Sequence, residues 1–282
     1  MYISNLKDKK LVQENVAKNL EDFQIELCSL DEIAIEKVGW KSVSMKDSNA
    51  FALSFFKANL KDCSFNRSNM QDAVFSNSSL SNVEYNGMTL IKASFEKCRI
   101  SSSKIKQSTM QRAKLKSCII ENTVFKNFEG IYGSIGDCVF KNCSFELTND
   151  QCMNGFADAS IKNSIFLDCN FIGSPLGGAK IDSCVFLDCH GEIEMTMSKK
   201  DEIQNSIAGM SEETVKDALA LLLSEKTQDE NHSSNLLLTD TQVKASSSKQ
   251  SIAHEPSEAG ETKEESAFEP VKKNGRFGNL EL

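Results

Sequence analysis

The stretch FFKANLKDCSFNRSNMQDAVF (Phe55–Phe75) repeats one pattern every five residues. Large apolar side chains recur at Phe55, Leu60, Phe65, Met70 and Phe75. Smaller ones stand two positions before the later members of this set, at Ala58, Cys63, Ser68 and Ala73. A spacing of two puts both residues on one face of an extended strand. Because the three polar residues between them are too few for a helix, the chain must turn. We interpret each unit as a short strand plus a corner, with one large and one small side chain pointing inward.

The five-residue pattern continues to Phe145, and only Gly130 breaks the series of large apolar residues. Phe128 stands two residues before Gly130, at the position where other units have a small residue. We interpret this as an exchange of the large and the small side chain within one unit. One five-residue unit cannot bury its own apolar face, whereas stacked coils bury a continuous core. The repeat therefore predicts a solenoid.

The length of one coil follows from longer similarities. They recur at steps of 20, 20, 26 and 20 residues in CRISSSKI (from Cys98), CIIENTVF (Cys118), CVFKNCSF (Cys138), SIFLDCNF (Ser164) and CVFLDCHG (Cys184). Twenty residues are four units, which predicts four sides per coil. The step of 26 predicts a loop insertion at about 146–156. Seven turns are predicted, the last one incomplete, with starts at Phe55, Phe75, Phe95, Leu115, Ile135, Ile161 and Ile181.

The unit Ala58-Asn59-Leu60-Lys61-Asp62 resembles the repeat A-(D/N)-L-x-x of the pentapeptide-repeat family. The resemblance covers roughly Phe55 to Gly191, with Cys and Ser often replacing Ala, and Phe or Ile often replacing Leu. It implies an all-β solenoid, a right-handed, four-sided β-helix. The family includes effectors that bacteria inject into host cells and acidic rods that protect topoisomerases.

The flanks predict a different organisation from the repeat. Residues 1–50 are interpreted as a capping segment with a helix over 5–22 and a strand in Phe23–Leu30, and residues 51–191 as the β-helix. Residues 192–226 form a C-terminal helical segment, in which Ser211–Lys226 is the helix and Ser211 its N-cap. Its apolar stripe is predicted at Val215, Leu219, Leu222 and Leu223. This helix either caps the solenoid or forms a homodimer. Residues 227–282 are Ser-, Thr-, Glu- and Lys-rich and predict a disordered acidic tail.

Charge is unevenly distributed along the 282 residues, whose net charge is −8. Residues 1–49 have a net charge of −2, residues 50–191 of +2 and residues 192–282 of −8. The repeat is thus neither a strongly basic nucleic-acid surface nor an acidic DNA mimic. There is no apolar run long enough to span a membrane and no apolar signal region. A cytoplasmic protein is expected, or one exported to a host cell without a cleaved signal peptide.

Chemistry-bearing residues are sparse, and we predict no enzyme, no cofactor and no metal. The sequence has three histidines, of which only His190 lies in the repeat, where it should point outward. Neither phosphate-binding glycine motif is present. Eight of the ten cysteines occupy the small inward position and are expected to be buried free thiols. Cys28 and Cys152 fall outside the pattern.

Two surface features are candidate binding sites. A basic band occupies one coil and comprises Lys97, Arg99, Lys104, Lys106, Arg112, Lys114 and Lys116. Because these residues fall on all four sides, solvation is the favoured reading and nucleic-acid binding is not expected. An aliphatic ladder continues from Arg99 and comprises Ile119, Val139, Ile165 and Val185. It is either a partner-binding surface or the seat of a terminal helix.

The leading functional prediction is a non-enzymatic protein–protein interaction scaffold, which the family resemblance extends to a bacterial effector. The partner is a protein of unknown identity. The first alternative is a topoisomerase-binding DNA mimic, which the +2 charge of residues 50–191 disfavours. The second alternative is an enzyme with its activity in the flanking segments, which carry no catalytic motif.

Overall fold

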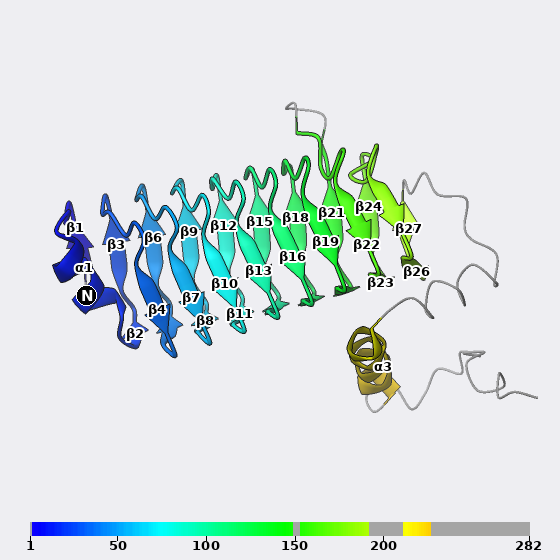
Figure 1. Cartoon of the computed structure of the whole chain (residues 1–282), viewed down its shortest axis with the longest axis horizontal. Coiled ribbons are helices and arrows are strands. Elements are labelled where there is room, and N and C mark those ends of the chain that lie inside the picture. Colours follow the sequence, from blue (N-terminus) through cyan, green and yellow to red (C-terminus); the bar gives the residue numbers. More distant parts are fainter. Residues whose placement is uncertain (1, 149–152, 192–210, 227–282) are drawn as a thin grey trace, which may run out of the picture. The chain divides into compact units, whose positions relative to one another are not determined.

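In the computed structural model, which describes residues 2–148, 153–191 and 211–226, the chain winds into a parallel β-solenoid of about nine turns. The coils stand in a row along one axis (Figure 1). The predicted all-β solenoid is confirmed, with two helices: α1 (Lys9–Val16) follows the first strand, and α3 (Glu212–Lys226) follows the last one in the sequence. The tail predicted over 227–282 lies outside the described residues.

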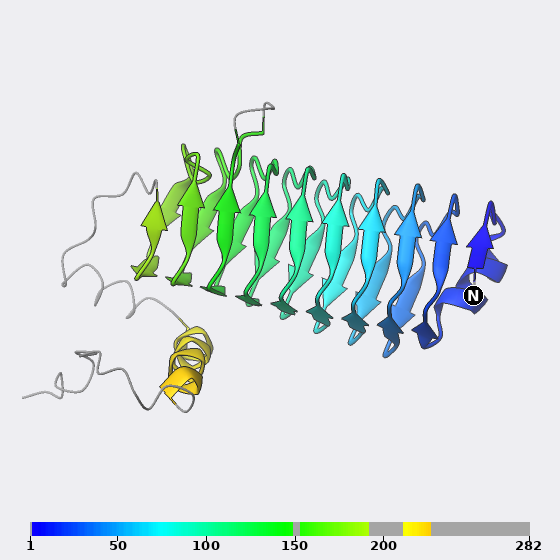
Figure 2. The same ribbon diagram turned by 180° about the vertical axis from the view of Figure 1, so that it is seen from behind.

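Three parallel sheets form three sides of the solenoid, and Figure 2 shows their strands from behind. Sheet 1 contains β1 (Tyr2–Ser4), β3 (Gln24–Glu26), β6 (Ser44–Lys46), β9 (Ser64–Asn66), β12 (Glu84–Asn86), β15 (Lys104–Lys106), β18 (Val124–Lys126), β21 (Ser144–Glu146), β24 (Asn170–Ile172) and β27 (His190–Gly191). Sheet 2 contains β2 (Leu20–Glu21), β5 (Gly39–Lys41), β8 (Asn59–Lys61), β11 (Ser79–Ser81), β14 (Arg99–Ser101), β17 (Ile119–Glu121), β20 (Val139–Lys141), β23 (Ile165–Leu167) and β26 (Val185–Leu187). Sheet 3 contains β4 (Ala34–Glu36), β7 (Ser54–Phe56), β10 (Val74–Ser76), β13 (Ser94–Glu96), β16 (Lys114–Lys116), β19 (Ser134–Gly136), β22 (Ser160–Lys162) and β25 (Lys180–Asp182).

The fourth side consists of single β-bridges followed by turns. The bridges form one column through Ser29, Asn49, Asn69, Thr89, Thr109, Glu129 and Gly155. Polar side chains reinforce this column, since the Asn69 amide donates to Asn49 Oδ1 at 2.9 Å. Each coil therefore has four sides, as the 20-residue period predicts.

Corner residues let the chain turn after only three strand residues. They adopt positive φ angles at every fifth position, for example 55° at Asp62 and 53° at Asn82. Such angles are uncommon outside glycine. Hydrogen bonds to the next coil hold these corners, since Asp62 N–H donates to the carbonyl of Ser81 at 2.9 Å.

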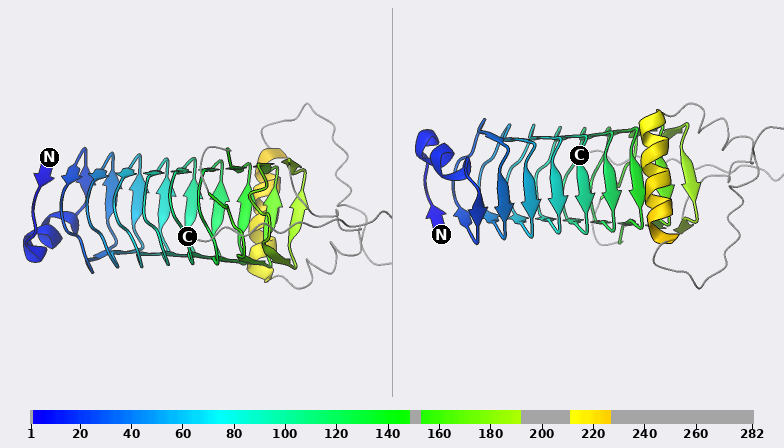
Figure 3. Two further views of the ribbon diagram at one scale, coloured as in Figure 1. Left: turned by 90° about the horizontal axis from the view of Figure 1, so that it is seen from above. Right: turned by 90° about the horizontal axis from the view of Figure 1, so that it is seen from below.

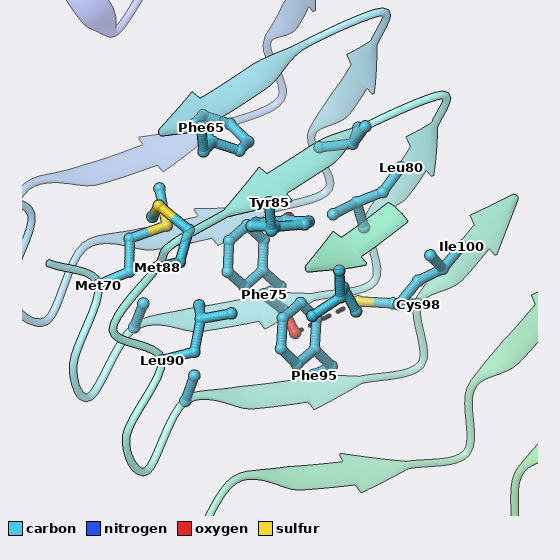
Figure 4. Close-up of a cluster of buried hydrophobic side chains, with 14 of the residues drawn as sticks. Phe65, Met70, Phe75, Leu80, Tyr85, Met88, Leu90, Phe95, Cys98 and Ile100 are labelled. Carbon is cyan, nitrogen blue, oxygen red and sulfur yellow. Dashed lines mark hydrogen bonds between the residues drawn. The ribbon is translucent and has the colours of Figure 1, made fainter. Parts of the chain in front are cut away.

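The core consists of aligned columns of inward side chains (Figure 4). Phe75 stacks on Phe55 and on Phe95, with ring centroids 5.1 and 4.7 Å apart. In-register pairing causes this alignment, because Phe75 is the partner of both residues in sheet 3. Stacked rings add to the stabilisation that comes from burying their apolar surface.

The small inward positions explain why Ser and Cys replace Ala in this repeat. Ser78 Oγ accepts from the Ala58 N–H at 3.1 Å and donates to the carbonyl of Ser76 at 2.9 Å. The thiol of Cys98 donates to the carbonyl of Phe75 at 3.3 Å (Figure 4). These side chains therefore satisfy buried backbone groups at the corners, which an alanine cannot do.

The loop insertion shifts the register by six residues in one coil. The coils before and after the insertion pair Ser134 with Ser160 and Ile135 with Ile161, which is a step of 26 residues. Pairing then returns to a step of 20, as between Ile161 and Ile181. Within the predicted insertion, residues 149–152 lie outside the described residues.

Gly130 and Phe128 were interpreted as an exchange of small and large side chains within one unit, and Gly130 also takes part in packing between coils. A Cβ atom on Gly130 would lie 2.7 Å from the ring of Phe156, the large inward residue of the next coil. Phe156 packs edge-on against Phe128, with ring centroids 4.8 Å apart. The missing side chain thus makes room for a ring in the following coil as well as for the ring in its own unit.

The solenoid begins earlier than the boundary predicted at residue 51. Strands β1 to β6 already belong to the three sheets, and Trp40 and Met45 pair in register with later coils. Only α1 departs from the repeat, and it is shorter than the helix predicted over 5–22. It lies between β1 and β2, where later coils have a strand of sheet 3. The described residues up to 50 are therefore mostly solenoid, with one helix in the first coil.

No helix among the described residues is long and apolar enough to cross a membrane.

Candidate interaction surfaces

The cysteines form two inward columns that the strand register creates. Cys98, Cys118 and Cys138 occupy successive coils of one column, and Cys143, Cys169 and Cys189 those of the other. Of the described cysteines only Cys189 is partly exposed, and all are free thiols.

Several thiols in these columns are held in the protonated form. The hydrogen bond with Cys118 and burial raise the pKa of the Cys98 thiol, and burial raises that of Cys184 to about 11. Thiolate is the reactive and metal-binding form, so these positions favour packing over chemistry. Within the described ranges, no group of three Cys, His, Asp or Glu side chains is arranged to hold a metal ion.

Cys28 is a correction to the sequence prediction. It occupies the small inward position of an early coil and is 3% exposed. The five-residue pattern that starts at Phe55 does not include this coil. Cys152 lies outside the described residues, and His190 is exposed, as predicted.

The aliphatic ladder forms as the period predicts, on the outer face of sheet 2. Arg99 pairs with Ile119, and the register continues through Val139, Ile165 and Val185. The ladder is not exposed, however, because Val139, Ile165 and Val185 are 1%, 5% and 2% exposed. Of the two alternatives left open by the sequence, the structure has the terminal helix seated on the ladder.

Helix α3 covers the ladder (Figure 3). Leu221 of α3 is buried against the ladder, and Val215 is half-buried there. The predicted stripe is therefore wrong at Leu219, which is 45% exposed. The side chains of Leu222 and Leu223 lie outside the described residues.

Polar contacts fix α3 in place beside the apolar ones. The ammonium group of Lys141, which is only 7% exposed, donates to the carbonyl of Leu221 at 2.8 Å. Thr214 Oγ1 donates to the carbonyl of Asp137 at 3.4 Å. Ser211 Oγ accepts from the Thr214 N–H at 3.1 Å, which is the N-cap contact predicted for this helix. Partial burial on α3 raises the pKa of Asp217, and Glu213 raises it further.

The basic band is unevenly neutralised around the coil. On sheet 2, Arg99 forms an ion pair with Glu121 at 2.7 Å. On sheet 1, Lys106 forms one with Glu84 at 3.2 Å. On sheet 3, Lys114 and Lys116 are exposed and form no ion pair within the described ranges. Lys104 on sheet 1 forms none there either, so unpaired positive charge is greatest on sheet 3, whereas the sequence suggested an even band.

The five-residue units also match a known family. The family model of pentapeptide repeats, in 8 copies, matches residues 54–87 and 68–107. Within residues 54–107 the solenoid is therefore similar to pentapeptide repeats.

The solved structures that match this chain are distant in sequence. A trypsin-treated variant of QnrB1, a plasmid-mediated fluoroquinolone resistance protein, is 13% identical, with a TM-score of 0.37 over 71% of this chain and 88% of that chain. HetL, a pentapeptide-repeat protein involved in heterocyst differentiation regulation from the cyanobacterium Nostoc sp. strain PCC 7120, is 12% identical, with a TM-score of 0.25 over 67% of this chain and 88% of that chain. No curated protein matches the sequence.

Two features of the solenoid were not predicted, although the sequence contains a signal for the first of them. The first coils retain large apolar residues at every fifth position from Leu20, including Ile25, Leu30 and Ile35. Leu221 is the second feature: it stands outside the predicted stripe, and only the position of the ladder determines which side of α3 is buried.

Proposed function

We propose that this pentapeptide-repeat protein is a non-enzymatic scaffold that binds a protein partner through the outer faces of its solenoid. The observation that supports this most is the seating of α3 on the ladder of sheet 2. A flat row of aliphatic side chains there accepts an amphipathic helix, which is a common mode of protein recognition.

The ladder suits reversible binding because it is separate from the core. Its apolar cluster comprises Val139, Ile165, Val185 and Leu221 with their neighbours, and the continuous core lies on the inner side of the same strands. Removing α3 would leave the inward columns untouched. A partner helix with an aliphatic residue at the place of Leu221 would make the same contacts, so α3 acts as the resident competitor.

The test is crosslinked capture from the native cells with the full-length protein, followed by mass spectrometry. Leu221→Asp should release α3 and increase capture of the partner. Ile165→Asp should abolish capture, because it places a charge in the ladder. Ile172→Asp is the matched control, since Ile172 is 44% exposed on sheet 1, and capture should be unchanged. Equal capture by the wild type and the Ile165→Asp variant would contradict the proposal.

The other candidate functions have weaker support. A topoisomerase-binding DNA mimic requires an acidic surface, whereas residues 50–191 have a net charge of +2. Unchanged gyrase supercoiling in the presence of the protein is the expected result. Delivery into a host cell stays a prediction, to be tested by fusing the full chain to an enzyme reporter that is active only in host cytosol.

A further inference from the structure

The outer face of sheet 3 carries a compact set of cations around β16. The set consists of Lys92, Lys97, Arg112, Lys114 and Lys116, all of them exposed. Lys114 and Lys116 stand on β16 itself, and the other three stand at the corners that border β13 and β16. We call these five residues the sheet 3 cluster.

The sheet 3 cluster is not neutralised by the chain. None of its members forms an ion pair within the described residues, whereas Arg99 and Lys106 of the same band do. Glu96 is the cross-strand neighbour of Lys116, and no ion pair joins the two. Asp137 directly follows Gly136, the neighbour of Lys116 on the opposite strand. Five cations beside these two carboxylates leave a positive patch that attracts anionic groups.

An exposed aromatic ring adjoins the cluster. Tyr132 is 62% exposed and stands at the corner that follows Arg112 one coil later. The strand beside Tyr132 offers only Ser134 and Gly136 on its outer face, so nothing bulky shields the ring. Arg and Tyr are, with Trp, the residue types enriched in the energetic centres of protein interfaces.

Acidic groups limit the length of the patch. Asp72 stands at the corner one coil before Lys92, and Asp158 at the corner one coil after Tyr132. The cations therefore span about 5 Å along the axis, one strand spacing between β13 and β16. A nucleic acid bound through 6–10 phosphates, as is usual for stable binding, needs a longer basic surface. A few carboxylates of a protein segment fit this size.

We propose that the sheet 3 cluster with Tyr132 is a docking surface for an acidic protein segment. The carboxylates of the segment pair with Lys114, Lys116 and Arg112, and an apolar side chain between them packs on the ring of Tyr132. This surface is separate from the ladder, which lies on sheet 2, so either can fail without the other.

The test measures binding of a fluorescent peptide of alternating Glu and Tyr to the full-length protein by anisotropy. Lys114→Glu/Lys116→Glu should weaken binding at least about tenfold, because it inverts the centre of the patch. Lys104→Glu/Lys106→Glu is the matched control, with the same change of charge on the neighbouring strand β15 of sheet 1, and should weaken binding no more than about twofold. Tyr132→Ser, which changes no charge, should weaken binding about fivefold.

Four outcomes would overturn the proposal. Equal losses in the two double variants would show attraction to net charge without a site. Unchanged binding by the Tyr132→Ser variant would show that the ring of Tyr132 does not contact the peptide. Tighter binding of a labelled DNA duplex or of vesicles containing phosphatidylserine than of the peptide would assign the patch to another class of partner. Tighter peptide binding after removal of residues 232–282, which include six glutamates and one lysine between 255 and 269, would assign the patch to this chain's own C-terminal residues.

Discussion

The two helices of this protein cover the solenoid in different ways. Val12 and Val16 of α1 are fully buried and belong to the continuous core. The indole N–H of Trp40 donates to the carbonyl of Val16 at 3.2 Å. Helix α3 instead contributes Leu221 to a separate cluster on the outer face of sheet 2.

This difference assigns the helices different roles. Helix α1 closes the end of a stack whose first coil would otherwise expose its inward side chains, so its loss costs core burial. Helix α3 covers a face whose strands already have their inner sides packed. We expect α1 to unfold with the solenoid and α3 to detach alone, as weakly coupled segments do.

The largest effect is expected for Val16→Asp. It places a charge in the core, and we expect the free energy of unfolding to fall by about 3 kcal/mol or more. Chemical denaturation followed by circular dichroism measures it. Leu11→Asp on the same helix is the control, because Leu11 is 48% exposed, and it should have almost no effect.

A smaller and local effect is expected for Leu221→Asp. Losing the burial of one leucine should weaken the seating of α3 by about 2 kcal/mol. The melting temperature of the sheets should stay unchanged, while α3 becomes sensitive to protease. Leu219→Asp should leave α3 protected, since Leu219 points to solvent. Cooperative loss of the sheets with α3 would mean that the helix is part of the core.

Thiol labelling compares the two ends of the solenoid. Cys28 donates to the carbonyl of Ile3 at 3.7 Å beneath the first coil and should need denaturant to react. Cys189, partly exposed in the last described coil, should react in the native protein, although slowly, because the hydrogen bond with Cys169 and burial raise its thiol pKa. Mass spectrometry after brief maleimide treatment identifies the site. Faster labelling of Cys28 than of Cys189 would contradict the capped N-terminal end.

The smallest effect concerns pH and Asp217. Its pKa lies above the ordinary 3.8 because partial burial disfavours the charged form and Glu213 adds repulsion, with Arg99 opposing both. Seated α3 therefore binds this proton more tightly than detached α3 does. Seating should strengthen as pH falls through the raised pKa towards 3.8, and weaken above it. Asp217→Asn should remove this dependence, measured as protease protection of α3 against pH, and an unaltered profile would exclude Asp217 as its source.

The sequence predicted the inward columns, because a period of five residues allows only one assignment of inward positions for Phe55, Leu60 and the residues that follow them. The columns of sheet 2 followed from the same period, since equal steps place Ile119 beside Val139. The start of the solenoid was not predicted, because Phe23, Ile33 and other large residues occupy its small positions. These large residues are nevertheless buried in the core.

The positions of the two surfaces were predictable from the sequence, but the ion pairing of the cations and the burial of the ladder were not. Counting placed seven cations in one coil, yet only side-chain geometry distinguishes the paired Arg99 from the unpaired Lys114. Likewise, the aliphatic ladder was found by spacing, whereas its cover depends on a chain segment about 80 residues away, as in the contact between Lys141 and Leu221.

Native-state hydrogen exchange resolved by mass spectrometry tests most directly whether α3 is a separable cover. In the full-length protein, amides of α3 should exchange much faster than those of α1 and of β13 to β19. Leu221→Asp should remove the remaining protection of α3 and leave the exchange of β13 to β19 unchanged. Exchange of α3 and the strands at one common rate, in both the wild type and the variant, would contradict a cover that detaches from an intact solenoid.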